Sequence, residues 1–85
     1  MKVVAAAIRD SDGNVHSLPP PARHNDVIQK MRAEGIRVRV THEQGFLLED
    51  DTFVDRVEAA QHAMEEGQAT KLSYSKTKLY SEDLW

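Results

Sequence analysis

The 85-residue sequence contains no cysteine and few aromatic residues, and its apolar runs are short. Without thiols the chain has no disulfides, and this absence gives no indication of its compartment. Acidic residues outnumber basic ones by 14 to 11, so the basic excess that non-specific binding of DNA or RNA requires is missing. The apolar run at residues 3–8 is too short for a signal peptide or a membrane span. We therefore expect no nucleic-acid partner and no membrane partner.

The length of the chain allows one domain, residues 1–85, with a single small core. Domains of this size often gain stability by assembling into oligomers. The sequence ends in an apolar and acidic segment that contains Tyr80, Leu84 and Trp85. We expect these side chains to pack either on their own chain or on a neighbouring subunit, and we favour the neighbour because a small core gains most from shared burial.

The pattern of apolar and polar residues predicts an α+β fold, in which a small antiparallel sheet and two helices follow the order ββαββα. Strand patterns occur at residues 2–9, 15–18 and 36–41, and residues 46–54 are expected to form a tight hairpin around Asp50-Asp51. Helices are expected at residues 25–34 and 55–66. The three prolines at residues 19–21 are expected to form a rigid, extended spacer before the first helix.

Both predicted helices begin near residues that suit an N-cap. Asn25 is expected to cap the first helix. Asp55 is expected to cap the second, and Glu58, three residues later, is expected to complete a capping box. The buried face of the second helix is predicted to consist of Val57, Ala60 and Met64.

The sequence contains no recognisable pattern for catalysis or for metal binding. None of the four histidines is spaced from another as in H-x-x-x-H, so no metal is expected. Neither the G-x-S-x-G motif of a nucleophilic serine nor a glycine-rich phosphate loop occurs. Carboxylates that are adjacent in sequence, such as Asp50 and Asp51, point apart and are expected to be solvated. We therefore expect no enzymatic activity and no cofactor.

Arg23 and His24 precede the first predicted helix and are candidates for anion binding. Backbone N–H groups at the start of a helix attract anions, and an arginine can bind a phosphate with two hydrogen bonds. The alternative is that Arg23 is a linker residue and that Asn25 or Asp26 simply caps the helix.

Phe46 is a candidate for stacking on a nucleotide base, because the preceding Gly45 allows close approach of the backbone. The alternative is that Phe46 belongs to the core, as we expect for Phe53, which should face it across the hairpin. Asp55 and Arg56 form a third candidate, since a carboxylate beside a guanidinium can bind ribose hydroxyls and phosphate together. Such a pair can also be a surface ion pair without a role.

These residues resemble, in order along most of the chain, a family of small phage proteins: the Thoeris anti-defence proteins of the first type. The resemblance includes Gln44-Gly45-Phe46-Leu47, and it continues through Phe53-Val54-Asp55-Arg56 to the end of the sequence. The matching segments are residues 4–8, 22–24, 26–28, 44–47, 53–56, 58–60, 67–68 and 79–85. The family has a small residue and then an arginine before the Phe-Val motif, where this chain has Asp51-Thr52, so an anion contact from that turn is not expected.

The resemblance implies a binding protein that sequesters cyclic ADP-ribose isomers made by TIR-domain enzymes and, in some members, cyclic di- or trinucleotides. It implies sequestration without hydrolysis, in the cytoplasm of the bacterial host, by a homo-oligomer that is a dimer or a hexamer. By this resemblance, Phe46 would stack on adenine, and Arg23, beside His24, would hold the pyrophosphate together with Arg56. Asp55 would contact ribose hydroxyls or the base.

Two other functions are compatible with the sequence. In the first, the protein binds a host defence protein directly through its acidic face, with Tyr80 and Trp85 as anchors. In the second, it is a small nucleotide hydrolase, which would change the mass of a bound ligand. If the protein binds a host protein directly, Phe46→Ala should affect stability alone. This substitution would therefore separate that alternative from nucleotide binding.

Overall fold

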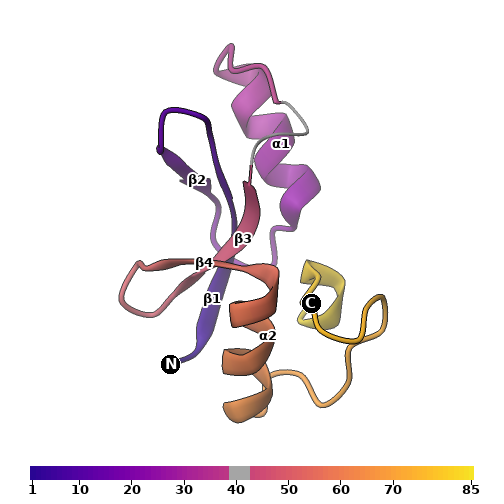
Figure 1. The fold of residues 1–85 in the computed structure, drawn as a ribbon. Helices are drawn as coiled ribbons and strands as arrows, with labels where there is room; N and C mark the ends of the chain where they lie inside the picture. The colour runs from indigo at the N-terminus through magenta and orange to yellow at the C-terminus, as the bar shows by residue number, and fades with distance from the viewer. Residues whose placement is uncertain (39–42) are drawn as a thin grey trace.

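The computed structural model describes residues 1–38 and 43–85, and it confirms the α+β fold with the order ββαββα. A four-stranded antiparallel sheet has the strand order β2-β1-β3-β4 (Figure 1). The strands are β1 (Val3–Arg9), β2 (Val15–Ser17), β3 (Glu43–Leu48) and β4 (Phe53–Asp55), the helices are α1 (His24–Ala33) and α2 (Arg56–Glu65), and a 3₁₀ helix, η1, spans Ser81–Asp83. No helix in the described part of the chain is long and apolar enough to cross a membrane.

β1 lies in the centre of the sheet, between β2 and β3, and its apolar run is buried accordingly. Two core clusters are built on it. Ile8 packs with Val27 and Met31 of α1, whereas the other cluster places the alanines of α2 against the lower part of the sheet. This second cluster consists of Val3, Ala6, Phe46, Leu48, Val54, Ala59, Ala60, Ala63, Ala69 and Leu79.

The start of α1 differs from the prediction, and the start of α2 agrees with it for Asp55 but not for Glu58. Among the described residues no hydrogen bond joins the Glu58 carboxylate to the main-chain N–H of Asp55, so the predicted capping box does not form. The N-cap of α1 is Arg23 rather than Asn25, and the main-chain N–H of Arg23 donates to the Asp26 carboxylate at 2.8 Å. Because this hydrogen bond caps the helix two residues earlier than predicted, Asn25 lies within the first turn of α1. Asp55 caps α2 as predicted, because its side chain accepts hydrogen bonds from the N–H groups of Val57 and Glu58.

The predicted buried face of α2 is wrong for two of its three residues. Ala60 is buried, but Val57 and Met64 are 40% and 49% exposed. The face that packs on the sheet consists instead of Ala59, Ala60 and Ala63. Small side chains allow the helix to approach the sheet closely, and the larger apolar side chains are turned outward.

The strand predicted at residues 36–41 is absent where the chain is described, since residues 36–38 have no strand structure, and residues 39–42 lie outside the described part. Ile36 and Val38 nevertheless pack against the cluster of Ile8, Val27 and Met31. The alternation of apolar and polar residues in this segment therefore arises from burial of one side, without pairing to a strand. The prolines also differ from the prediction: the N–H of Ala22 donates to the carbonyl of Pro19 at 3.2 Å, so this segment turns and is not a straight spacer.

The hairpin of β3 and β4 is present, but Phe46 and Phe53 do not face each other. Phe46 pairs with Val54, and Phe53 pairs with Leu47. Successive residues of a strand point to opposite faces, so the two rings lie on opposite sides of the sheet. Phe53 is therefore half-buried outside the core, with the guanidinium of Arg9 at 4.7 Å from its ring centre.

The segment after α2 returns across its own chain. The side-chain amide of Gln68 pairs with both main-chain groups of Val3, at 2.7 Å each. Further on, the indole N–H of Trp85 donates to the carbonyl of Ala22 at 2.9 Å. Leu84 packs against the α2 cluster. Trp85 and Leu84 therefore pack on their own chain, which is the less favoured of the two arrangements expected from the sequence.

A candidate anion site at the start of α2

Arg56, the first residue of α2, is held in place by three contacts from separate parts of the chain. Its guanidinium donates to the main-chain carbonyl of Leu79 at 2.8 Å and to the side-chain oxygen of Gln44 at 2.6 Å. The same group lies over the ring of Tyr80, 4.2 Å from its centre. In return, the main-chain N–H of Leu79 donates to the carbonyl of Arg56 at 2.9 Å. Arg56 thus joins β3, α2 and the C-terminal segment.

The charge of Arg56 is not neutralised by a direct ion pair in the described part of the chain. Its hydrogen-bond acceptors, Leu79 and Gln44, are both neutral, and none of the ion pairs between described residues includes it. Burial lowers the pKa of Arg56, although an arginine remains protonated at any physiological pH. The charge of Glu82 acts on Arg56 in the opposite direction to burial, but no carboxylate among the described residues contacts the guanidinium directly. The N–H donors of Arg56 that remain unused can therefore bind an anion from solution.

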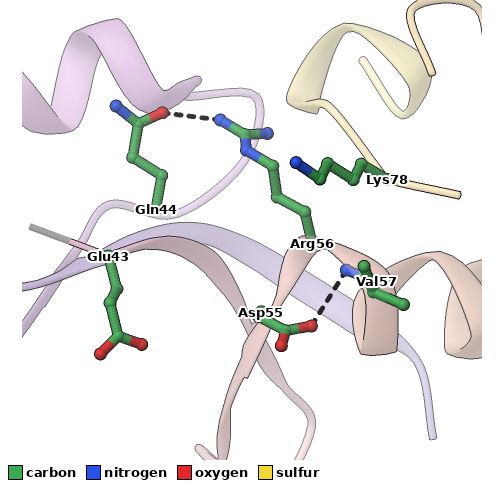
Figure 2. Close-up of a pocket in the computed structure, with 6 residues that line it drawn as sticks. All are labelled: Glu43, Gln44, Asp55, Arg56, Val57 and Lys78. Carbon is green, nitrogen blue, oxygen red and sulfur yellow. Dashed lines mark hydrogen bonds between the residues drawn. The ribbon is translucent and has the colours of Figure 1, made fainter. Parts of the chain in front are cut away.

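A pocket of about 270 Å³ opens beside Arg56, at the start of α2 (Figure 2). Figure 2 shows the ammonium group of Lys78 directed toward the Arg56 guanidinium. The carboxylates of Glu43 and Asp55 point away from these two cationic groups. The pocket is lined by Glu43, Gln44, Asp55, Arg56, Val57 and Lys78. The lining of the pocket therefore includes two cations and two carboxylates.

Asp55 has a structural task and a free oxygen. Both N-cap hydrogen bonds, from Val57 and Glu58, end at its Oδ1 atom. No hydrogen bond within the described residues uses Oδ2, and the residue is exposed. This second oxygen can accept hydrogen bonds from a ligand without weakening the cap.

His24 is buried at the start of α1, where it connects three elements. Its Nε2 atom lies 2.7 Å from the carbonyl of Gly45, which can only accept, so Nε2 carries the proton. Burial lowers the pKa of His24 to about 4, and the nearby charge of Arg56 acts in the same direction. The neutral ring therefore accepts at Nδ1 from the hydroxyl of Ser81, 3.2 Å away. These bonds fasten η1 to the sheet.

Ser81 and His24 are residue types that can form a nucleophilic dyad, but both are buried away from solvent. Ser81 is 1% exposed and His24 is 6% exposed, so a substrate does not reach the hydroxyl in this structure. The role that their geometry supports is the attachment of the C-terminal segment.

Phe46 lies in the core position that the sequence analysis gave as the alternative to base stacking. Its side chain is fully buried, and its ring meets that of His24 edge-on at 4.9 Å between centres. The backbone before it leaves no room for a side chain, because a Cβ atom at Gly45 would lie 2.1 Å from the carbonyl oxygen of Val54. From this position the ring of Phe46 does not reach the pocket surface.

Arg23 is exposed and does not line the pocket. Its Nε atom donates to the main-chain oxygen of Trp85 at 2.7 Å, so it holds the end of the C-terminal segment. The structure thus brings Asp55 and Arg56 together in one pocket, places His24 and Phe46 in the core beneath, and uses Arg23 elsewhere.

Gln44, Lys78 and Tyr80 are site residues that the sequence analysis did not assign to the site. Gln44 had a usable signal, because it directly precedes Gly45 in the segment that contains the candidate residue Phe46. Lys78 and Tyr80 had none, since their proximity to Arg56 results from the return of the C-terminal segment. Within residues 1–38 and 43–85, no group of three His, Asp or Glu side chains is arranged to hold a metal ion.

Comparison with known proteins identifies one family. No curated protein and no solved structure matches the chain significantly. The model of the family described as phage T4 y16D protein matches residues 2–85, which is nearly the whole chain. The chain therefore belongs to the phage T4 y16D protein family.

Proposed function

We propose that this phage protein binds and sequesters cyclic nucleotide signals of bacterial defence, of the cyclic ADP-ribose type, in the cytoplasm of the infected host. The observation that supports this proposal most strongly is the half-buried Arg56, which is held by neutral acceptors and has Lys78 beside it in a pocket. Membership of a family of phage proteins supports a role during infection. The resemblance to Thoeris anti-defence proteins supplies the class of ligand.

The pocket suits the sugar-phosphate part of such a ligand. An arginine has five N–H donors, and Leu79 and Gln44 occupy only two of those of Arg56, so its remaining donors and the Lys78 ammonium can bind phosphate oxygens. The free oxygen of Asp55 can accept from a ribose hydroxyl in the same pocket. With about 270 Å³, the pocket accommodates part of a nucleotide, since pockets for whole small molecules usually exceed about 300 Å³.

Sequestration requires affinity and slow release, and it requires no catalytic group. Arg56 is already positioned by its contacts with Gln44, Leu79 and Tyr80, so little side-chain ordering remains to be paid on binding. We therefore propose binding without hydrolysis.

The alternative function, direct binding of a host protein, requires Tyr80 and Trp85 as exposed anchors. In this structure the ring of Tyr80 contacts Arg56 and Tyr74, and the indole N–H of Trp85 is bonded to Ala22. Both side chains thus make contacts within the chain, which favours nucleotide binding over this alternative.

Calorimetric titration with cyclic ADP-ribose isomers and cyclic di- and trinucleotides tests the proposal. Lys78→Ala is expected to raise the Kd of the bound nucleotide by about tenfold or more, because it removes one charge-assisted hydrogen bond. Lys71→Ala is the matched control: Lys71 is an exposed lysine of the same segment that does not line the pocket, and its removal should leave the Kd unchanged. Equal losses of affinity in both variants, or no binding by the wild type, would reject the site.

A further inference from the structure

The pocket beside Arg56 adjoins a second pocket along α2, of about 220 Å³, which we call the α2 groove. Val57 lines both pockets. The C-terminal segment bounds both as well, with Lys78 in the first pocket and Lys76 and Thr77 in the groove. A ligand that occupies the first pocket can therefore extend past Val57 into the groove.

The α2 groove has the composition of a site for a flat and mostly apolar group. Its apolar lining consists of Val57, Ala60, Met64 and Leu72, and among its lining residues Lys76 alone is charged. Met64 is 49% exposed, and a methionine thioether makes favourable contacts with the ring of an aromatic ligand. Small-molecule sites combine such walls with a few polar groups that fix the orientation of the ligand.

Gln61 is the side chain of the groove that can distinguish one nucleotide base from another. It is exposed, and it follows Val57 by four residues on α2, so the two side chains lie on the same face of the helix. A glutamine amide offers one donor group and one acceptor, which match N7 and the 6-amino group of adenine. Guanine and hypoxanthine have an oxygen at position 6 and offer two acceptors, so one of the two hydrogen bonds is lost.

The spacing of these residues along α2 suits a single nucleotide. The helix rises about 6 Å from Val57 to Gln61, which is comparable to the span of one ribose. When the phosphate is bound by Arg56 and Lys78, the ribose lies beside Val57 and the base reaches Gln61. The groove thus supplies space for the part of a nucleotide that the first pocket is too small to hold.

We propose that the α2 groove is the base subsite of this protein, and that the amide of Gln61 makes it select adenine over hypoxanthine and guanine. This inference rests on the proposed function, because the phosphate contacts of Arg56 and Lys78 place the ligand beside Val57. It assigns the base to a position other than Phe46, whose ring is fully buried.

A third pocket, of about 180 Å³, is the competing position for a base, because it is lined by Tyr74 and Tyr80 together with Glu82. It has no lining residue in common with the pocket of Arg56. The guanidinium of Arg56 also lies over the ring of Tyr80, at 4.2 Å from its centre, and covers one of its faces. The shared Val57 therefore favours the α2 groove.

Titrations with ribose 5-phosphate, AMP and IMP, followed by NMR, test the base subsite separately from the phosphate site. Ribose 5-phosphate has no base, and IMP has hypoxanthine in place of adenine. AMP should bind about tenfold more tightly than ribose 5-phosphate, because only AMP fills the groove and makes both hydrogen bonds to Gln61. It should bind about fivefold more tightly than IMP, which makes one of them.

Two substitutions on α2 assign the preference to Gln61. Gln61→Leu should remove the difference between AMP and IMP and leave the Kd of ribose 5-phosphate unchanged. Glu65→Gln is the matched control, because Glu65 is exposed on the same helix and does not line the groove, and this variant should retain all three affinities. Lys78→Ala should weaken the binding of all three compounds, since each carries the phosphate.

The possible results separate the base subsite from the proposed function. If AMP binds no more tightly than ribose 5-phosphate, or if Gln61→Leu retains the preference for AMP over IMP, the base subsite is refuted, and the loss caused by Lys78→Ala would still support the phosphate site. If Tyr74→Ala removes the preference and Gln61→Leu does not, the base lies in the third pocket and the inference is wrong. Failure of all three compounds to bind the wild type would refute the phosphate site and the base subsite together.

Discussion

At the scale of single residues, the site depends on the charge of Arg56 and on the neutral form of His24, and the surroundings of each side chain determine both. Arg56 is held by neutral acceptors, so its charge is available to a ligand. His24, beneath it, is kept neutral by burial and is therefore able to accept from Ser81 and donate to Gly45. The two residues cooperate, because the charge of Arg56 also disfavours a second charge on His24.

The low pKa of His24 predicts a loss of stability in acid. Its folded-state pKa of about 4 lies below the ordinary value of 6.5, so the unfolded chain takes up the proton first as the pH falls. The free energy of unfolding should fall between about pH 6.5 and pH 4, by about 3 kcal/mol. Urea denaturation at several pH values measures this loss. His24→Gln should lack this component, and an equally steep fall in that variant would assign the pH dependence to other groups.

Gly45→Ala is predicted to be one of the most destabilising single substitutions in the chain. Its Cβ would lie 2.1 Å from the Val54 carbonyl oxygen and 2.7 Å from the ring of Phe53, so β3 and β4 would have to separate. We expect a loss of about 3 kcal/mol or more, or failure to fold. Gly13→Ala is the comparison, because no atom lies within 4 Å of its Cβ and only the positive φ is strained. If both variants unfold at the same urea concentration, the tight approach at Gly45 is not maintained in solution.

At the scale of helices and strands, the sequence predicts those features that depend on residues close together in the chain. The turn signals and the Asp55 cap follow from residue preferences within a few positions, and the fold order and the hairpin follow from apolar patterns. The buried face of α2 was not predictable in this way. Hydrophobicity favoured Val57 and Met64, whereas close packing on the sheet selected the alanines. Similarly, Phe46 and Phe53 lie on opposite faces of the sheet because of the register of the hairpin, which a shift of one residue would change.

The N-cap of α2 allows the structural and binding roles of Asp55 to be separated. Asp55→Asn retains a side-chain oxygen for the cap, so the free energy of unfolding should change by less than about 0.5 kcal/mol. Asp55→Ala should cost about 1 kcal/mol. Both variants should weaken nucleotide binding, because both remove the carboxylate from the pocket. Thermal unfolding and calorimetry on the same samples measure the two effects, and unchanged affinity in Asp55→Asn would remove Asp55 from the ligand site.

At the scale of the whole molecule, the start of α1, the start of α2 and the C-terminal segment converge (Figure 1). His24 binds Ser81, Arg56 binds Leu79, and Arg23 binds Trp85. This convergence creates the site, and it explains why sequence reasoning found only part of it. Asp55 and Arg56 are neighbours in sequence, but Lys78 and Tyr80 reach them only through the returning segment.

The most direct test of the account is recovery of a bound ligand. The protein is incubated with a cyclic ADP-ribose isomer, free nucleotide is removed by filtration, and the protein is heated to release what it holds, which mass spectrometry then identifies. We predict that the ligand is retained by the wild type, retained less by Lys78→Ala, and released with its mass unchanged. A ligand that passes the filter completely would contradict binding, and a ligand recovered with the added mass of water would contradict sequestration and indicate a hydrolase.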